Sequence, residues 1–205
     1  MAEDTRLTTI AELEALYGRP SGGAVSKETD HLIAPYRRFV EAAPFLSLAT
    51  RGEKGVECSP RGDAPGFVKV LDPRTLLVPD RKGNRRMESL RNILTDPHVA
   101  LLFLIPGVGE TLRVRGRAII STDPALLALG TMRGTPPLSA LVVSIDSVLF
   151  QCSRAIARSG LWTDEARVER ASLPTAGEML KATDATFDGD GFDQAWKTEE
   201  KAGMV

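Results

Sequence analysis

The chain has 205 residues, of which 26 are basic and 27 acidic, and its net charge of −1 excludes the bulk positive field that nucleic acids or anionic membranes attract. Its hydrophobic content of 42% is enough for a sizeable core, and we expect one domain over residues 1–205. Cys58 and Cys152 have no CxxC partner, which favours reduced thiols over a disulfide framework or zinc site, with one chance disulfide left open. No apolar run approaches the ~18 residues of a membrane span, and no secretory leader is visible, so we expect a soluble, cytoplasmic protein.

Two amphipathic helices are predicted near the N-terminus. Thr9 and Glu12 form a capping box, and Gly18 ends the first helix, over residues 10–17. The second helix, over residues 31–42, has one apolar face. We expect both to pack as a layer against the rest of the chain.

A β region follows, with short links typical of antiparallel pairing. Gly116 is expected at a bulge, and Pro79-Asp80 is expected to end the fourth strand. The predicted strands cover residues 45–50, 56–60, 67–71, 75–78, 98–105 and 111–121, with one bent or two short strands in 138–152. Six or seven strands with one inserted helix favour a mainly β fold, a small closed or partly closed barrel with α-helices.

The helix inserted between these strands is unusual in its charge. Gly83-Asn84 is a good N-cap candidate, and Met87, Leu90 and Leu94 give the helix an apolar face. Its first turn would hold two arginines, where the helix dipole favours acidic residues. This basic turn is either solvated or a site for a phosphate monoester, and its residues are Arg81, Lys82, Arg85 and Arg86.

Shorter helices are predicted further along, over residues 123–130 with Thr122 as cap, over 153–159 and over 177–183. The order of residues 187–205 stays open. Arg113 and Arg115 share one face of a strand and point together to a ligand, a partner subunit or solvent. Aromatic residues make up only 5% of the chain and do not interleave with the arginines, which argues against nucleic-acid binding.

The common catalytic and metal-binding signatures are absent. There is no Walker loop, HExxH or GxSxG motif and no adjacent His/Cys set, so we expect no metal site. Gly107-Val-Gly109 is interpreted as a hairpin loop and Asp188-Gly-Asp190 as a solvated turn. His31 and His98 are isolated and are expected to serve in packing or at the surface.

Six ordered blocks of the sequence resemble the pyridoxamine 5′-phosphate oxidase-like FMN-binding split-barrel family, in particular a subgroup with an N-terminal helical extension. The blocks are LEALYGRP, FVEAAPFLSLAT, SPRGDAPGFVKVLD, LLVPDRKGNRRMESLRNIL, LLFLIPGVGETLRVRGRA and RSGLW. The resemblance implies a six-stranded antiparallel split barrel over residues 44–152, a helical extension over 1–43 and a C-terminal helical segment and tail over 153–205. It also implies a homodimer with FMN at the subunit interface.

The same resemblance implies which residues contact the flavin. Arg61, and the element Asn84-Arg85-Arg86 with Lys82, would hold the phosphate, while Ser59, Pro60 and Asp80 would line the flavin. Thr111 and Arg113 would reach it from the barrel of the same or of the other subunit, and Arg158 to Trp162 would close the site. We expect Arg81 to face water. The full set is Ser59, Pro60, Arg61, Asp80, Lys82, Asn84, Arg85, Arg86, Thr111, Arg113, Arg158 and Trp162.

These features predict an FMN-dependent oxidoreductase acting on an unknown small molecule. The Arg-x-His element that true oxidases of vitamin B6 use to hold pyridoxal phosphate has no match after Trp162, so vitamin B6 oxidation is not expected. Nothing in the sequence nominates a general acid or base. The alternatives are a flavin-binding or regulatory module without turnover, or heme or the deazaflavin F420 in the same groove.

Overall fold

The computed structural model describes residues 5–81, 83 and 85–201, with side chains up to residue 198. Seven strands form one antiparallel sheet in the order β2-β1-β5-β6-β7-β4-β3. The strands are β1 (Phe45–Gly52), β2 (Gly55–Gly62), β3 (Lys69–Asp72), β4 (Thr75–Asp80), β5 (His98–Leu104), β6 (Thr111–Ser121) and β7 (Ser139–Gln151). The mainly β class is confirmed. The sheet has seven strands rather than the implied six, and its edge strands β2 and β3 are not paired with each other.

The sheet curls around a core built from alternate residues of its strands. Leu46 and Leu48 of β1, Leu101 and Phe103 of β5, and Leu112 of β6 are fully buried. Period-two alternation sends these side chains to one face, which accounts for the clean register of β1, β5 and β6. The helices α3 (Ala34–Ala42) and α4 (Glu88–Thr95) complete the core.

The fourth strand is longer than the sequence predicts. It continues through the dipeptide expected to end it, with Pro79 opposite Ala140 and Asp80 opposite Ser139 of β7. Because β3 pairs only with residues 75–77 of β4, the edge at Pro79 has no second neighbour and needs no backbone donor. The sixth strand agrees with its predicted bounds, and its register shifts at Gly116 as expected.

The helix after β4 begins later than predicted. Its expected N-cap, Asn84, lies outside the described residues, and α4 begins at Glu88. Arg85 and Met87 have φ values of 61° and 55°, and these left-handed conformations prevent a helix from starting before Glu88. The expected apolar face is also displaced, because Met87 and Leu94 are exposed while Ile93 is buried.

The described residues form six further α-helices. They are α1 (Ile10–Tyr17), α2 (Gly23–Ser26), α5 (Pro124–Leu129), α6 (Arg154–Ser159), α7 (Ala176–Thr183) and α8 (Gly189–Lys201). The capping box at Thr9 is confirmed, whereas α5 is capped by Asp123 rather than Thr122. None of the helices in the described part of the chain is both long and apolar enough to cross a membrane.

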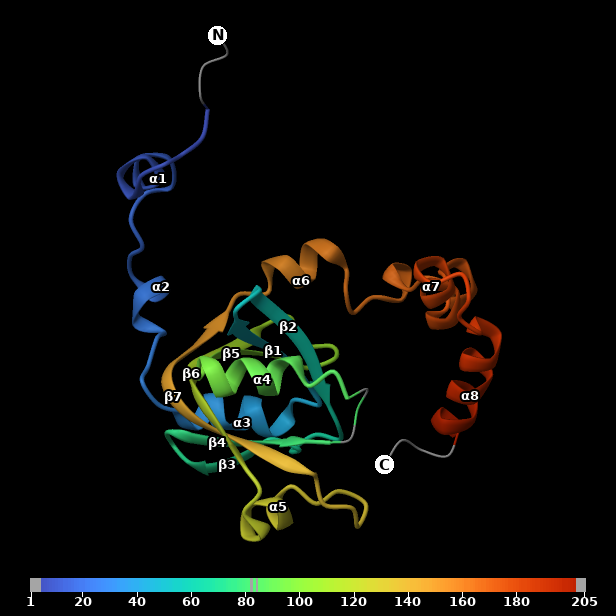
Figure 1. The fold of residues 1–205 in the computed structure, drawn as a ribbon. Helices are drawn as coiled ribbons and strands as arrows, with labels where there is room; N and C mark the ends of the chain where they lie inside the picture. Colours follow the sequence, from blue (N-terminus) through green and yellow to red (C-terminus); the bar gives the residue numbers. More distant parts are fainter. Residues whose placement is uncertain (1–4, 82, 84, 202–205) are drawn as a thin grey trace.

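Both ends of the chain stand away from the sheet (Figure 1). Helix α1 has no buried residue. Helices α7 and α8 pack on each other, and a Cβ on Gly177 would lie only 2.1 Å from the carbonyl oxygen of Gly189. This close backbone approach fixes the hairpin as a folded unit, although its side chains Met179 and Trp196 are about half exposed.

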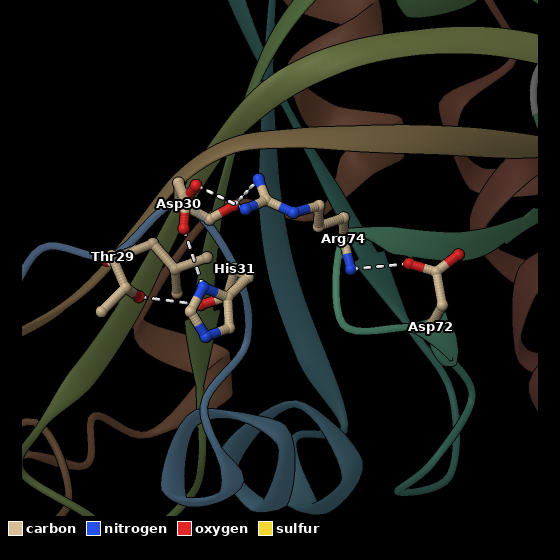
Figure 2. A network of polar contacts seen from close by, with 6 residues as sticks. Thr29, Asp30, His31, Asp72 and Arg74 are labelled. Carbon is tan, nitrogen blue, oxygen red and sulfur yellow. Dashed lines mark hydrogen bonds and ion pairs between the residues drawn. The ribbon is translucent and has the colours of Figure 1, made fainter.

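A polar network joins the segment before α3 to the β3–β4 turn (Figure 2). The Asp30 carboxylate accepts from Arg74 and contacts His31 Nδ1 at 2.7 Å, and Thr29 Oγ1 donates to the His31 carbonyl at 2.8 Å. Asp72 Oδ1 accepts from the Arg74 backbone N–H. His31 and Arg74 lower the pKa of Asp30 to about 2. The network therefore fixes the N-terminal extension to the sheet while the carboxylate is ionised.

Candidate functional site

A groove of about 980 Å³ lies where the end of β2, the end of β4 and the start of α4 meet. Its volume falls at the upper end of the range of small-molecule and cofactor sites. The sequence-predicted residues Ser59, Pro60, Arg61, Asp80, Arg85 and Arg86 line it together. Residues from two separate predicted segments, 59–61 and 80–86, thus meet at one place, because β2 and β4 both end on this side of the sheet.

Arg61 is held inside the groove by its own strand and by β4. Its Nη1 donates to Ser59 Oγ at 2.6 Å and to the Pro60 carbonyl at 2.9 Å. Its Nη2 lies 3.4 Å from Asp80 Oδ1, and the two side chains are only 19% and 16% exposed. Burial raises the pKa of Asp80, and the nearby Arg61 charge opposes that rise.

Arg81 does not face water, so this expectation was wrong. Its Nε donates to Asp63 Oδ2 at 2.8 Å, and its terminal nitrogens donate to the Gly130 and Thr135 carbonyls at 3.0 Å and 3.3 Å. The side chain is 25% exposed and joins β4 to the loop after α5. The sequence contains no local sign of this role, because residues 130–135 reach Arg81 only in the folded chain.

Arg85 and Arg86 precede the helix rather than occupying its first turn. The helix-dipole argument therefore does not apply to them, since the first turn of α4 holds Glu88, the residue type that the dipole favours. Arg86 forms an ion pair with Glu88, in which the Nε–Oε2 distance is 3.1 Å. Arg85 is exposed and makes no ion pair or side-chain hydrogen bond with the described residues. Its guanidinium is available to a ligand.

Of the four acidic residues that line the groove among the described residues, only Asp80 was predicted from the sequence. Glu57, Asp63 and Glu88 line it with Asp80, and each lies near an arginine or an amide. Asn92 Nδ2, for example, donates to Glu57 Oε2 and to Thr50 Oγ1, both at 3.1 Å, and this attaches α4 to β1 and β2. The alternation of Arg and Asp in the segment SPRGD was the signal that could have revealed part of this set.

Four predicted site residues do not line this groove. Thr111 contacts Gln151 across β6 and β7, Arg113 lies two residues further on the same face, and Arg158 is exposed on α6. Trp162 Nε1 donates to the Val108 carbonyl at 2.8 Å. Arg113 Nε is buried and has no hydrogen-bond partner among the described residues. The two remaining predicted residues, Lys82 and Asn84, lie outside the described residues.

Comparison with known proteins supports the resemblance seen in the sequence. The family model of pyridoxamine 5′-phosphate oxidase matches residues 32–152. No curated protein matches the chain significantly.

Several solved structures are similar to part of the chain. HupZ of Group A Streptococcus shares 15% identity over 57% of this chain and 91% of its own, with a TM-score of 0.47. An FMN-binding protein of Syntrophomonas wolfei shares 12% over 56% and 86%, with a TM-score of 0.41. A FAD-binding protein of Mesorhizobium loti shares 15% over 60% and 96%, also with a TM-score of 0.41. Because the family model covers more than half of its length, this chain belongs to the pyridoxamine 5′-phosphate oxidase family.

Proposed function

We propose that the protein binds FMN in the groove and acts as an FMN-dependent oxidoreductase on a small molecule. The observation that carries the proposal is Arg85, an arginine with no partner among the described residues that lines the same groove as the largely buried Arg61. Guanidinium groups bind phosphate through paired, charge-assisted hydrogen bonds. Arg61 and Arg85 would hold the phosphate. Arg86 would also contact it after its ion pair with Glu88 breaks, and that ion pair is exposed and contributes little free energy.

The chemistry of the groove fits a flavin mononucleotide. The arginines suit the phosphate, while Pro60, Met87 and Leu138 offer apolar surface to a ring system. When bound, FMN supplies hydride or electron transfer, and the protein supplies binding and orientation. Neither histidine of the chain lines the groove, so the described residues offer no histidine ligand for a heme there.

Cofactor binding can be measured directly. We expect the purified protein to show a flavin spectrum, or its cofactor-free form to bind FMN in the micromolar range. Absence of both would refute the proposal. Reduction of the bound flavin by NADH or NADPH, followed by reoxidation with candidate acceptors, separates an enzyme from a flavin-binding module. No reduction by any donor would favour the module.

A homodimer with FMN at the interface is part of the proposal, and two observations support it. Thr111, Arg113, Arg158 and Trp162 are not at the groove of their own chain, so a second copy would have to supply them. Apolar side chains on the detached end segments are also exposed, among them Ile10 at 71% and Tyr17 at 77%. Such surfaces are typical of interfaces between subunits.

Mixed dimers test whether one site uses residues of both subunits. If Arg85→Ala and Arg113→Ala each abolish FMN binding, a dimer with one subunit of each kind regains one intact site, because both substitutions then fall in the other site. Random mixing should restore about a quarter of all sites. No recovery in verified mixed dimers would place both residues in a site formed by one chain.

A further inference from the structure

The described residues that line the groove carry balanced charges. Among its described lining residues, four arginines face four acids, and three arginines have an acidic partner: Arg61 with Asp80, Arg81 with Asp63, and Arg86 with Glu88. A phosphate dianion entering this groove therefore finds one arginine without a partner. To gain a second, it must compete with an acid of the protein itself.

The pair formed by Arg61 and Asp80 is the place where this competition matters most. Arg61 Nη1 donates hydrogen bonds to Ser59 Oγ and the Pro60 carbonyl, and Asp80 Oδ1 lies 3.4 Å from Nη2. Both side chains are more than four-fifths buried, so water screens their interaction poorly. A phosphate that approaches Arg61 enters the neighbourhood of the Asp80 carboxylate, and two buried anions side by side repel each other.

We propose that Asp80 sets the phosphate affinity of the groove: it neutralises Arg61 in the ligand-free protein and gives Arg61 up when a phosphomonoester binds, taking one proton from solvent. This inference rests on the proposed function and identifies the residue that controls it. The only bond that forms on the protein is the O–H bond of the Asp80 carboxyl group, and its proton leaves a solvent or buffer molecule. Asp80 thus pairs with the largely buried Arg61 when no phosphate is bound, and it weakens the binding of a phosphate.

The other acids of the groove are less suited to this role. The ion pair with Arg86 lowers the pKa of Glu88, which therefore holds its charge more firmly than a free carboxylate. Asp63 is tied to Arg81, which three acceptors hold in place. Burial has the opposite effect on Asp80 and raises its pKa, which favours the uptake of a proton by this carboxylate. Among the described residues, the other charged groups that line the groove are Glu57 and Arg61 on β2, Asp63 after it, Arg81, Arg85 and Arg86 after β4, and Glu88 on α4.

Asp80→Asn tests the proposal, because it keeps the shape of the side chain and removes its charge. FMN and riboflavin, which lacks the phosphate, are titrated into wild type and variant at about pH 7.5. We expect the ratio of FMN to riboflavin affinity to rise at least about tenfold in the variant, the factor of one pKa unit. Asp146→Asn is the matched control: Asp146 lies 3.6 Å from Arg117 outside the groove, and its loss changes the net charge equally. The control should leave the ratio unchanged.

Proton uptake provides a second measurement that needs no variant. Calorimetric titration of wild type with FMN in buffers of different ionisation enthalpy should show uptake of protons, whereas the FMN phosphate itself, with a second pKa of about 6, can only release them on binding to cations. We also expect wild-type FMN affinity to rise as the pH falls from about 7.5 to about 6.5, above the second pKa of the phosphate, because the bound state has the higher Asp80 pKa. Should Asp80→Asn not fold, this wild-type result decides.

The outcomes separate the inference from the proposed function. If wild type binds neither flavin, the proposed function fails and the inference with it. If wild type binds FMN, but Asp80→Asn leaves the FMN-to-riboflavin ratio unchanged or lowers it, Asp80 does not compete with the phosphate and the inference alone is wrong. If Asp80→Asn and Asp146→Asn changed the FMN-to-riboflavin affinity ratio equally, the change would come from net charge alone, and the inference would also be wrong.

Discussion

Arg85 is the side chain on which the proposed phosphate site most depends, and Arg85→Ala should weaken FMN binding strongly. The three other described arginines of the groove have acidic partners, so a ligand gains less from them. A charge-assisted hydrogen bond contributes roughly 1.5–3 kcal/mol. Its loss from Arg85 corresponds to an increase of about 10- to 150-fold in the Kd for FMN. Fluorescence or calorimetric titration of cofactor-free protein measures this change.

The matched control for this experiment is Arg91→Ala. Arg91 is exposed on α4 and does not line the groove, so its loss changes the net charge equally but removes no ligand contact. Riboflavin, without a phosphate, should bind wild type and Arg85→Ala with similar affinity. The substitution keeps a side chain at a left-handed position, so the backbone cost is nearly unchanged. If Arg91→Ala weakens FMN binding as much, or if riboflavin loses affinity equally with Arg85→Ala, Arg85 does not bind the phosphate.

Two further predictions concern stability. Gly116→Ala should lower the free energy of unfolding by at least about 3 kcal/mol in urea titrations, because the new Cβ would lie 2.1 Å from the Ser144 carbonyl oxygen. The control is Gly23→Ala, where the new Cβ would meet nothing within 4 Å. Equal effects of the two substitutions on stability would contradict the argument. Stability should also fall as the pH drops from the ordinary Asp30 pKa of 3.8 towards its folded value of about 2, because a lowered pKa stabilises the fold only while the carboxylate is ionised. Asp30→Asn should flatten this part of the pH profile, and an unchanged profile would exclude Asp30 as its cause.

Most strands could be predicted because their signals are local. Strand β6 alternates between buried and more exposed residues over 112–119, and Gly116 lies at its register shift. Helix α1 carries a complete capping box, which needs no tertiary context. The end of β4 was missed for a tertiary reason: proline is excluded from a strand only where its missing N–H has a neighbour to bond, and β3 stops short of Pro79.

The sequence allowed several residues of the candidate site to be predicted, but not how its arginines are paired with acids. The resemblance and the charge pattern both selected Arg61, Arg85 and Arg86, and the fold brings these residues to one groove. The start of α4 was beyond prediction, since nothing in the sequence requires Arg85 and Met87 to adopt positive φ. These two backbone conformations place the arginines in a loop beside the groove instead of in a helical turn.

Because acids offset most arginines of the groove, a phosphate is recognised there by short-range contacts rather than by a long-range positive field. A cluster of uncompensated arginines would attract any anion through its field, and affinity would then follow the number of negative charges. Here Asp63, Asp80 and Glu88 each offset an arginine, so little net field remains at a distance. Selectivity then depends on contacts that form only at close range, where a phosphate meets Arg85 and displaces Asp80 from Arg61. A groove of this kind favours a ligand whose ring system also binds the apolar surface, because the contacts of the ring help to offset the ion pair that the phosphate displaces.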